Sequence, residues 1–151
     1  MKKFALIFMF LLCFTMAVYL DDESQAIFAF DGKFSLYGVG SCETDCEVVN
    51  CGAGIIASVE SSKAKTLVHN FNGKVYGYSI ELNSLKSLEE ILKLIKADVV
   101  RKEIVCDREI FYCYSSQTNN YVVEDNKKIN YQIVFNNGKI VIGTPLILGS
   151  Y

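Results

Sequence analysis

The sequence predicts an α+β fold, in which a mixed, mostly antiparallel and curved sheet carries two amphipathic helices packed on one face. Two apolar, β-branched runs flank Asn137-Gly138, and this dipeptide is the strongest short-range signal for a two-residue hairpin turn. Two other segments have apolar residues at helical spacing, and several short strand-like segments follow them. A chain of 151 residues is long enough for one such domain with its own core.

Residues 1–20 are typical of a signal peptide. Lys2 and Lys3 precede a long apolar run, and cleavage is predicted after Ala17. An uncleaved anchor is the alternative, because a run of this length reaches the lower limit for spanning a bilayer. In both cases residues 21–151 are expected to form a single α+β domain in the extracellular space or the cell envelope. No later segment predicts a membrane span.

The charge of this domain excludes two classes of partner. The chain has 15 basic and 17 acidic residues, and without Lys2 and Lys3 the basic residues number 13, which leaves a formal charge of −4. The charges are scattered and form no basic stripe. Nucleic acid and anionic membrane surfaces bind clustered Lys and Arg, so neither is expected as a partner. The absence of an Asn-x-Ser/Thr sequon favours a bacterial envelope protein.

The first part of the domain is expected to contain two strands joined by a cysteine-bearing loop. The first strand covers 26–40, the loop covers 41–53 and the second strand covers 55–59. Phe34 and Leu36 share one face of the first strand, and the alternation leaves open which face is buried.

Two helices are predicted, each followed by a strand. The first helix has an apolar face, and Gly73 stands where a left-handed C-terminal cap is expected. The second helix begins at Ser87, because Ser87 and Glu90 match a capping box. Strands over 74–82 and 98–106 follow, so the two units are either a weak repeat or two ordinary amphipathic helices. The apolar faces consist of Ala64, Leu67, Val68 and Phe71 in the first helix and of Leu88, Ile91, Leu92 and Ile95 in the second.

The chain from Val99 onward is expected to form an antiparallel meander with three hairpin turns. The turns are predicted at Asp107-Arg108, Asp125-Asn126 and Asn137-Gly138. The strands between them cover 110–115, 121–124 and 127–135.

The last hairpin is expected at the centre of the sheet. Its turn pairs Phe135 with Ile140 and Ile133 with Ile142, which makes one side of the hairpin wholly apolar. Pro145 has no N–H to donate to an interior ladder, so the second strand is expected to lose a partner near this residue.

Five cysteines follow the signal segment and are disulfide candidates in an oxidising compartment. A turn at Asp107-Arg108 would hold Cys106 about 13 Å from Cys113 at ~3.3 Å per residue, which is too far for a bond. Both are therefore expected to pair with cysteines of the 41–53 loop, leaving one thiol over. The five candidates are Cys42, Cys46, Cys51, Cys106 and Cys113.

The cysteine loop also suggests a metal site or a redox site. The spacing of Cys42, Cys46 and Cys51 does not match paired zinc ligands, and a fourth ligand would have to come from elsewhere. The carboxylates of this loop disfavour the thiolate that redox or nucleophilic chemistry needs.

No catalytic motif is present, so no catalytic residue, metal or cofactor is assigned. His69 is expected on the polar side of the first helix, and a dyad with a free cysteine is the catalytic alternative. Four tyrosines of the meander are either ordinary strand residues or a binding surface, because Tyr is favoured at interfaces. They are Tyr112, Tyr114, Tyr121 and Tyr131.

The C-terminal half resembles the YwmB-type secreted proteins of Gram-positive bacteria. The resemblance rests on the segments 112–115, 128–133 and 141–151, with an Asn-x-Gln-Ile strand and an Ile-Gly-Thr-Pro-Leu-Ile ending. It implies a fold like that of the TATA-box-binding protein, a cell-envelope setting and no catalytic residue. This chain departs from the family in being shorter and in carrying the cysteine loop.

These observations favour an exported, non-catalytic domain that binds a protein, a peptide or a cell-envelope component through its sheet face or an edge strand. The alternative is a cysteine-dependent redox or metal-binding protein that uses Cys42, Cys46 and Cys51.

Overall fold

The structure is a computed structural model that describes residues 25–148. The predicted signal segment over 1–20, the polar lead that follows it and residues 149–151 lie outside the described residues. No helix within 25–148 is long and apolar enough to cross a membrane.

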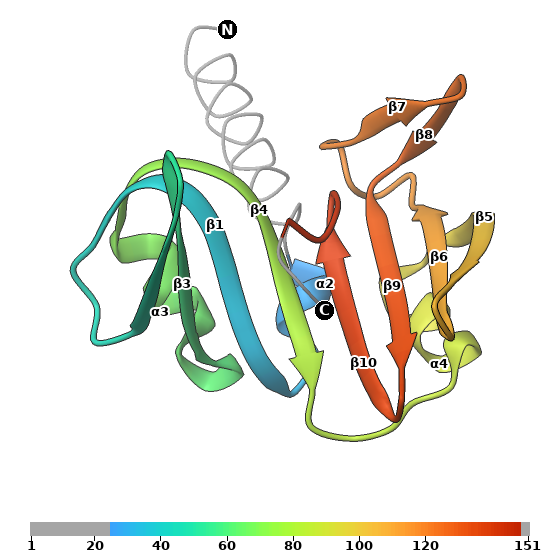
Figure 1. The fold of residues 1–151 in the computed structure, drawn as a ribbon, viewed down its shortest axis with the longest axis horizontal. Coiled ribbons are helices and arrows are strands. Elements are labelled where there is room, and N and C mark those ends of the chain that lie inside the picture. Colours follow the sequence, from blue (N-terminus) through green and yellow to red (C-terminus); the bar gives the residue numbers. More distant parts are fainter. Residues whose placement is uncertain (1–24, 149–151) are drawn as a thin grey trace, which may run out of the picture.

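Eight strands form one antiparallel sheet that curves strongly along its length (Figure 1). Their order across the sheet is β2-β3-β1-β4-β10-β9-β6-β5, and β7 and β8 form a separate two-stranded ribbon. Every pairing among the described strands is antiparallel, so the parallel part expected of a mixed sheet is not found there. The bounds are β1 Gly32–Cys42, β2 Glu47–Cys51, β3 Gly54–Glu60, β4 Phe71–Leu82, β5 Asp98–Val105, β6 Arg108–Tyr114, β7 Val122–Glu124, β8 Lys127–Ile129, β9 Tyr131–Asn136 and β10 Lys139–Thr144.

Three α-helices add buried residues to one hydrophobic cluster, which also holds Phe34 and Leu36 of β1. Both residues are fully buried, which settles the face of β1 that the sequence left open. The helices are α2 Gln25–Phe28, α3 Ala64–Asn70 and α4 Leu88–Ile95, and a short 3-10 helix, η1 Ser61–Lys63, leads into α3. Their fully or almost fully buried residues include Ile27, Leu67, Ile91 and Ile95.

The predicted C-terminal hairpin is confirmed in its turn, register and position. Phe135 pairs with Ile140 and Ile133 with Ile142. β10 lies between β9 and β4, and its pairing with β4 ends at Thr144. The apolar side of the hairpin belongs to the hydrophobic cluster, as the short-range pattern predicted.

The predicted start of the second helix is also confirmed. The Ser87 hydroxyl accepts a hydrogen bond from the backbone N–H of Glu90 at 3.2 Å, and the Glu90 carboxylate accepts one from the N–H of Ser87 at 2.8 Å. These are the two reciprocal bonds of a capping box.

The expected strand over 26–40 is wrong in its first part, where α2 precedes β1. Ile27 and Phe30 are both buried, which is the three-residue spacing of a helical turn and not strand alternation. The expected loop over 41–53 is also mostly strand, because β1 runs to Cys42 and β2 begins at Glu47.

The predicted cap at Gly73 is wrong, because α3 ends at Asn70 and Gly73 lies inside β4. Gly73 pairs there with Gly40 of β1, and both have φ near the edge of the region that only glycine enters freely, 153° and 157°. A Cβ atom on either glycine would clash with a carbonyl oxygen of the facing strand. This glycine pair lets β1 and β4 approach closely, at the end of the β1–β4 ribbon that curls over in Figure 1.

The predicted antiparallel meander is right in part and wrong in part. The turn at Asp125-Asn126 forms as predicted, but β6 pairs with β9, so β7 and β8 are an excursion from the large sheet. The expected strand over 127–135 is interrupted by the buried Asn130. The predicted turn at Asp107-Arg108 is shifted by one residue, since Val105 pairs with Arg108.

Candidate functional site

A row of directly paired residues crosses all eight strands on one side of the sheet. Each member faces the next across a strand pair, so their side chains lie on one face. Six of the eight residues have a hydroxyl, amide or charged side chain, and the other two are a glycine and a tyrosine. From β2 to β5 the row is Glu47, Ser58, Ser35, Ser79, Gly143, Gln132, Tyr112 and Arg101.

Hydroxyl groups form the part of this row on β3, β1 and β4. The hydroxyls of Ser35 and Ser58 are 2.8 Å apart. The Tyr37 hydroxyl lies 3.0 Å from that of Ser79. Both distances are those of hydrogen bonds, so the strands are joined by side chains as well as by their backbones.

The row has no side chain at Gly143, where the C-terminal segment folds back over the sheet. A Cβ atom on Gly143 would lie 2.5 Å from the side chain of Ile147. The backbone N–H of Ile147 donates a hydrogen bond to the Gln132 side-chain oxygen at 2.9 Å. The exit after Thr144, expected to lack a strand partner, is therefore held against its own sheet.

A groove of about 340 Å³ lies along this row, between β2 and the returning C-terminal segment. We call it the sheet groove. It mixes three kinds of side chain: hydroxyls, aliphatic groups and charges. The lining residues are Ser35, Tyr37, Ser58 and Ser79, then Val49, Ile56, Val141 and Ile147, and then Lys33, Glu47 and Glu81.

The charges of the sheet groove offset one another. The Lys33 ammonium lies 2.7 Å from the Glu47 carboxylate, and this hydrogen bond raises the pKa of Lys33 above its ordinary value. Lys139 lies 3.0 Å from Glu81 on the same side. Both pairs are well exposed, so each adds little stability and mainly keeps the groove near neutrality.

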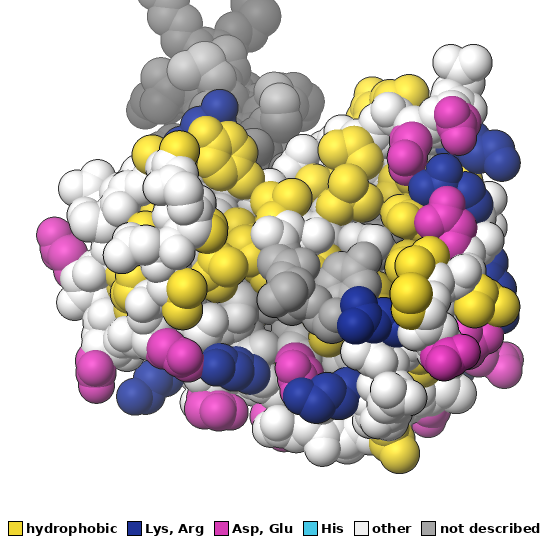
Figure 2. All heavy atoms as spheres, in the orientation of Figure 1, with side chains coloured by type: hydrophobic (Ala, Val, Ile, Leu, Met, Phe, Trp, Pro, Cys, Tyr) yellow, Lys and Arg dark blue, Asp and Glu magenta, His cyan; other side chains and the backbone are white. Residues whose placement is uncertain are grey.

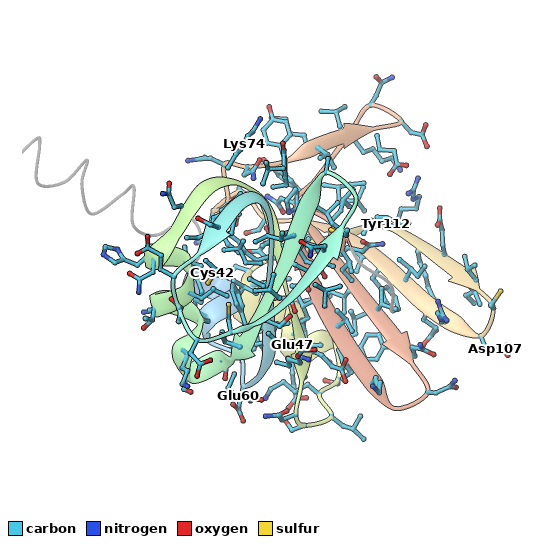
Figure 3. All side chains as sticks on the ribbon, turned by 60° about the vertical axis from the view of Figure 1, so that its left-hand side comes forward. Cys42, Glu47, Glu60, Lys74, Asp107 and Tyr112 are labelled. Atoms are coloured by element: carbon cyan, nitrogen blue, oxygen red, sulfur yellow. The ribbon has the colours of Figure 1, made fainter. Side chains whose placement is uncertain are left out.

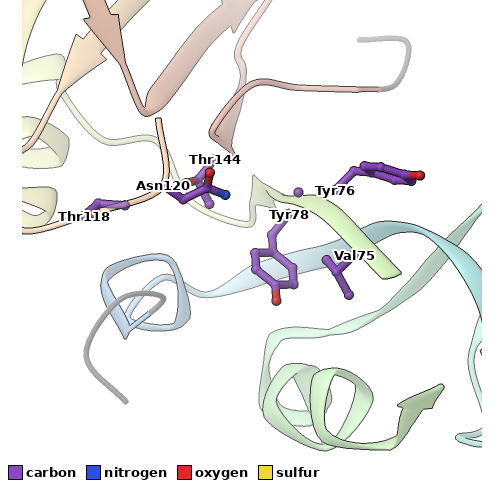
Figure 4. A pocket seen from close by; sticks show the side chains of 7 residues that line it. Val75, Tyr76, Tyr78, Thr118, Asn120 and Thr144 are labelled. Carbon is purple, nitrogen blue, oxygen red and sulfur yellow. The ribbon is translucent and has the colours of Figure 1, made fainter. Parts of the chain in front are cut away.

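A second pocket, of about 250 Å³, lies between β4 and the loop after β6 (Figure 4). Tyr76 lines it from a β-bulge, because Tyr37 pairs with Gly77 while Gly38 pairs with Val75. The Tyr78 ring stacks on Phe34 with 5.6 Å between ring centres, and burial raises the pKa of Tyr78.

The four candidate tyrosines do not share one exposed surface. Tyr131 is only 2% exposed, and its hydroxyl lies 3.1 Å from that of Thr118. Tyr112 is half-buried beneath the guanidinium of Arg101, 4.1 Å from its ring centre. Tyr114 is half-buried as well. Tyr121, the residue before β7, is 40% exposed. Tyr131 is therefore a core residue.

The cysteines are placed differently from the expected pairing. Cys42 and Cys46 are in contact, with 3.0 Å between their sulfur atoms. Cys51 is exposed, and so is Cys106 in the β5–β6 turn. The next residue of this turn, Asp107, lies on the side of the molecule away from Cys42 in Figure 3. Cys113 is fully buried, and burial raises the pKa of its thiol to about 12. The structure thus does not bring the hairpin cysteines to the 41–53 loop.

No metal-ligand group comes together in residues 25–148, whereas Cys42 and Cys46, which the redox alternative uses, are in contact. No group of three or more His, Cys, Asp and Glu side chains there is arranged to hold a metal ion. His69 is exposed on α3, as expected for the polar side of that helix.

Comparisons with protein-family models, with curated proteins and with solved structures find no match to this chain. The site therefore has to be interpreted from its own geometry. The sheet groove could not be predicted from the sequence, because its hydroxyls come from three strands whose serines show no local motif.

Proposed function

We propose that the chain is an exported, non-catalytic domain that binds an extended peptide segment of a partner protein in the sheet groove. The observation that carries the proposal is the mixture of hydroxyl and aliphatic side chains along one groove of offset charge. Export is proposed from the pattern of residues 1–20 alone. The likeness to YwmB-type secreted proteins agrees with export and stays a proposal for the C-terminal half.

We also propose that α2, α3 and α4 all cover the face that carries Phe34 and Leu36. Their buried residues belong to one cluster with these two side chains. Ser35 and Tyr37 alternate with them and so point to the other face, which the sheet groove occupies. The helices then support the sheet from behind and leave the groove open to a partner.

A peptide matches the lining better than a strongly charged ligand does. Peptide N–H and C=O groups find partners in the half-buried hydroxyls of Ser35 and Ser58, and aliphatic side chains find Val49 and Ile56. The paired charges give no surplus of either sign to attract a polyanion or a polycation. Figure 2 shows this mixture, with acidic and basic side chains alternating along the lower edge of the face.

A carbohydrate of the envelope matches it less well. A sugar ring packs on an exposed aromatic face, and the one aromatic residue of the sheet groove, Tyr37, is only 8% exposed. Its hydroxyl is already engaged with Ser79.

Selection of displayed random peptides on the immobilised full chain tests the proposal. Peptides enriched on the wild-type chain are expected to lose at least tenfold in affinity for Ser35→Trp and Ser58→Trp, which fill the groove. The matched control is Thr66→Trp, at an exposed position of α3, and it is expected to bind as the wild type does. Circular dichroism verifies that all three variants are folded. Failure to enrich any peptide, or equal binding to the filled variants, would refute the proposal.

A further inference from the structure

Cys42 and Cys46 lie at the two ends of the short connection between β1 and β2. Cys42 is the last residue of β1, and Cys46 stands directly before β2. The close pair of Gly40 and Gly73 in the β1–β4 ribbon stands two residues before Cys42. Both cysteines are partly buried and pack against the hydrophobic cluster.

The two sulfur atoms are in direct contact. The Cys46 thiol donates a hydrogen bond to the Cys42 sulfur over 3.0 Å. A disulfide bond is about 2.0 Å long, so the sulfurs need to approach by about 1 Å to form one. The other cysteines of residues 25–148 have no such neighbour: Cys51 and Cys106 are exposed, and Cys113 lies alone in the core.

We propose that Cys42 and Cys46 are a disulfide site, and that their bond closes the β1–β2 connection in the mature protein. The two thiols lose two protons and two electrons as the S–S bond forms. A disulfide oxidant accepts them and is reduced to two thiols, by way of a mixed disulfide that the second sulfur resolves.

The environment favours a structural bond over a reactive one. Burial, with the neighbouring Cys42 thiol, raises the pKa of Cys46 to about 11 from 9.0. The thiolate is the nucleophile in cysteine chemistry, so a thiol that stays protonated at neutral pH is a poor catalyst. The same connection is held to α3, where the Asn70 amide donates to the Thr44 hydroxyl at 3.4 Å.

The bond would also fix one wall of the sheet groove. Cys46 directly precedes Glu47, whose carboxylate holds Lys33 at 2.7 Å on the groove side of β1. Closing the connection restricts where β2 begins and so keeps this ion pair beside the groove. The site itself rests only on the sulfur geometry and does not depend on what the groove binds.

Peptide mapping after oxidation tests the assignment. The full chain is incubated with oxidised glutathione, denatured with an alkylating reagent and without reductant, and cleaved after glutamate. Glu43 and Glu47 separate the three cysteines of this region into fragments 24–43, 44–47 and 48–60. We expect 24–43 bonded to 44–47, with Cys51 alkylated in 48–60.

Two variants make the result specific. Cys106→Ser is expected to keep the bonded fragments, and Cys46→Ser is expected to leave Cys42 alkylated. The assignment is overturned if 24–43 is recovered alkylated from the oxidised wild-type chain, or bonded to a fragment other than 44–47. Because the oxidant is supplied, this outcome is independent of export and of peptide binding.

Discussion

Asn130 is the clearest case of one residue that organises its surroundings. Its side chain is fully buried between β8 and β9. The amide oxygen accepts from the N–H of Ser115 at 2.8 Å, and the amide nitrogen donates to the carbonyls of Ser115 and Thr118 at 2.7 and 3.0 Å. It thus satisfies backbone groups of the loop after β6 that have no strand partner.

Replacing Asn130 by Ala is expected to lower the free energy of unfolding by about 3 kcal/mol, because it leaves several buried backbone groups unsatisfied. Asn50→Ala, at an exposed position of β2, is the matched control and should change it by less than about 0.5 kcal/mol. Urea unfolding of both variants measures the difference. Equal effects would mean that the three hydrogen bonds do not hold the loop.

The buried thiol of Cys113 is expected to make the free energy of unfolding depend on pH in the alkaline range. Burial, with a smaller effect of Asp98, raises its pKa from 9.0 to about 12. The folded state keeps the proton that the unfolded chain loses, so this contribution is complete below about pH 9 and is lost as pH rises toward 12. The expected slope is about 1.4 kcal/mol per pH unit.

The variant Cys113→Ala removes this slope. The stability advantage of the reduced wild-type protein over the variant is therefore expected to be smaller at about pH 10.5, inside the range between the ordinary and the raised pKa, than at about pH 8, below that range. Urea unfolding at the two pH values measures it. An advantage that stays constant would show that Cys113 ionises as easily in the folded state as in the unfolded chain.

Sequence reasoning succeeded at this scale where partners are close along the chain. Ser87 and Glu90 are three residues apart, and their capping box could be predicted. The partners of Asn130 are 12 and 15 residues away in a loop of no regular pattern, so nothing local indicated its role.

At the scale of elements, the glycine pair of the β1–β4 ribbon is expected to be intolerant of any side chain. Gly73→Ala should lower the free energy of unfolding by about 3 kcal/mol or more, because its Cβ would meet the carbonyl of Val39. Gly52→Ala is the control: its φ is 64° but no atom lies within 4 Å, so about 1 kcal/mol is expected. Thermal or urea unfolding separates the two, and equal losses would contradict a close approach of the strands.

The capping box of α4 predicts a smaller and local effect. Ser87→Ala removes the acceptor for the Glu90 N–H and should cost about 1 kcal/mol. Ser84→Ala, in the exposed segment before the helix, should cost almost nothing. Urea unfolding of the two variants measures both losses, and a Ser87 variant as stable as the Ser84 variant would mean that α4 does not depend on its cap.

Elements were predictable where one local signal dominated. The Asn137-Gly138 turn was placed correctly, with its register. The β5–β6 turn was misplaced because it uses Cys106 and Asp107 at φ of 49° and 64°, and cysteine is seldom chosen for a left-handed conformation. β2 was missed because its five residues are all exposed and show no alternation.

At the scale of the molecule, the mostly antiparallel sheet with few helices could be predicted from the sequence. The sheet groove could not. Ser35, Ser58 and Ser79 become neighbours only when β1 pairs with both β3 and β4 in one register, and no local pattern fixes two registers at once.

The position of a bound peptide tests the central claim most directly. The measurement is the change in backbone amide chemical shifts of the full chain on titration with a peptide enriched on the wild-type protein. We predict that the largest changes fall on Ser35, Ser58 and Ser79, and that Ser35→Trp abolishes them. Largest changes at the exposed edge residues Ile104 and Val105 of β5 would contradict the assignment of the sheet groove as the binding site.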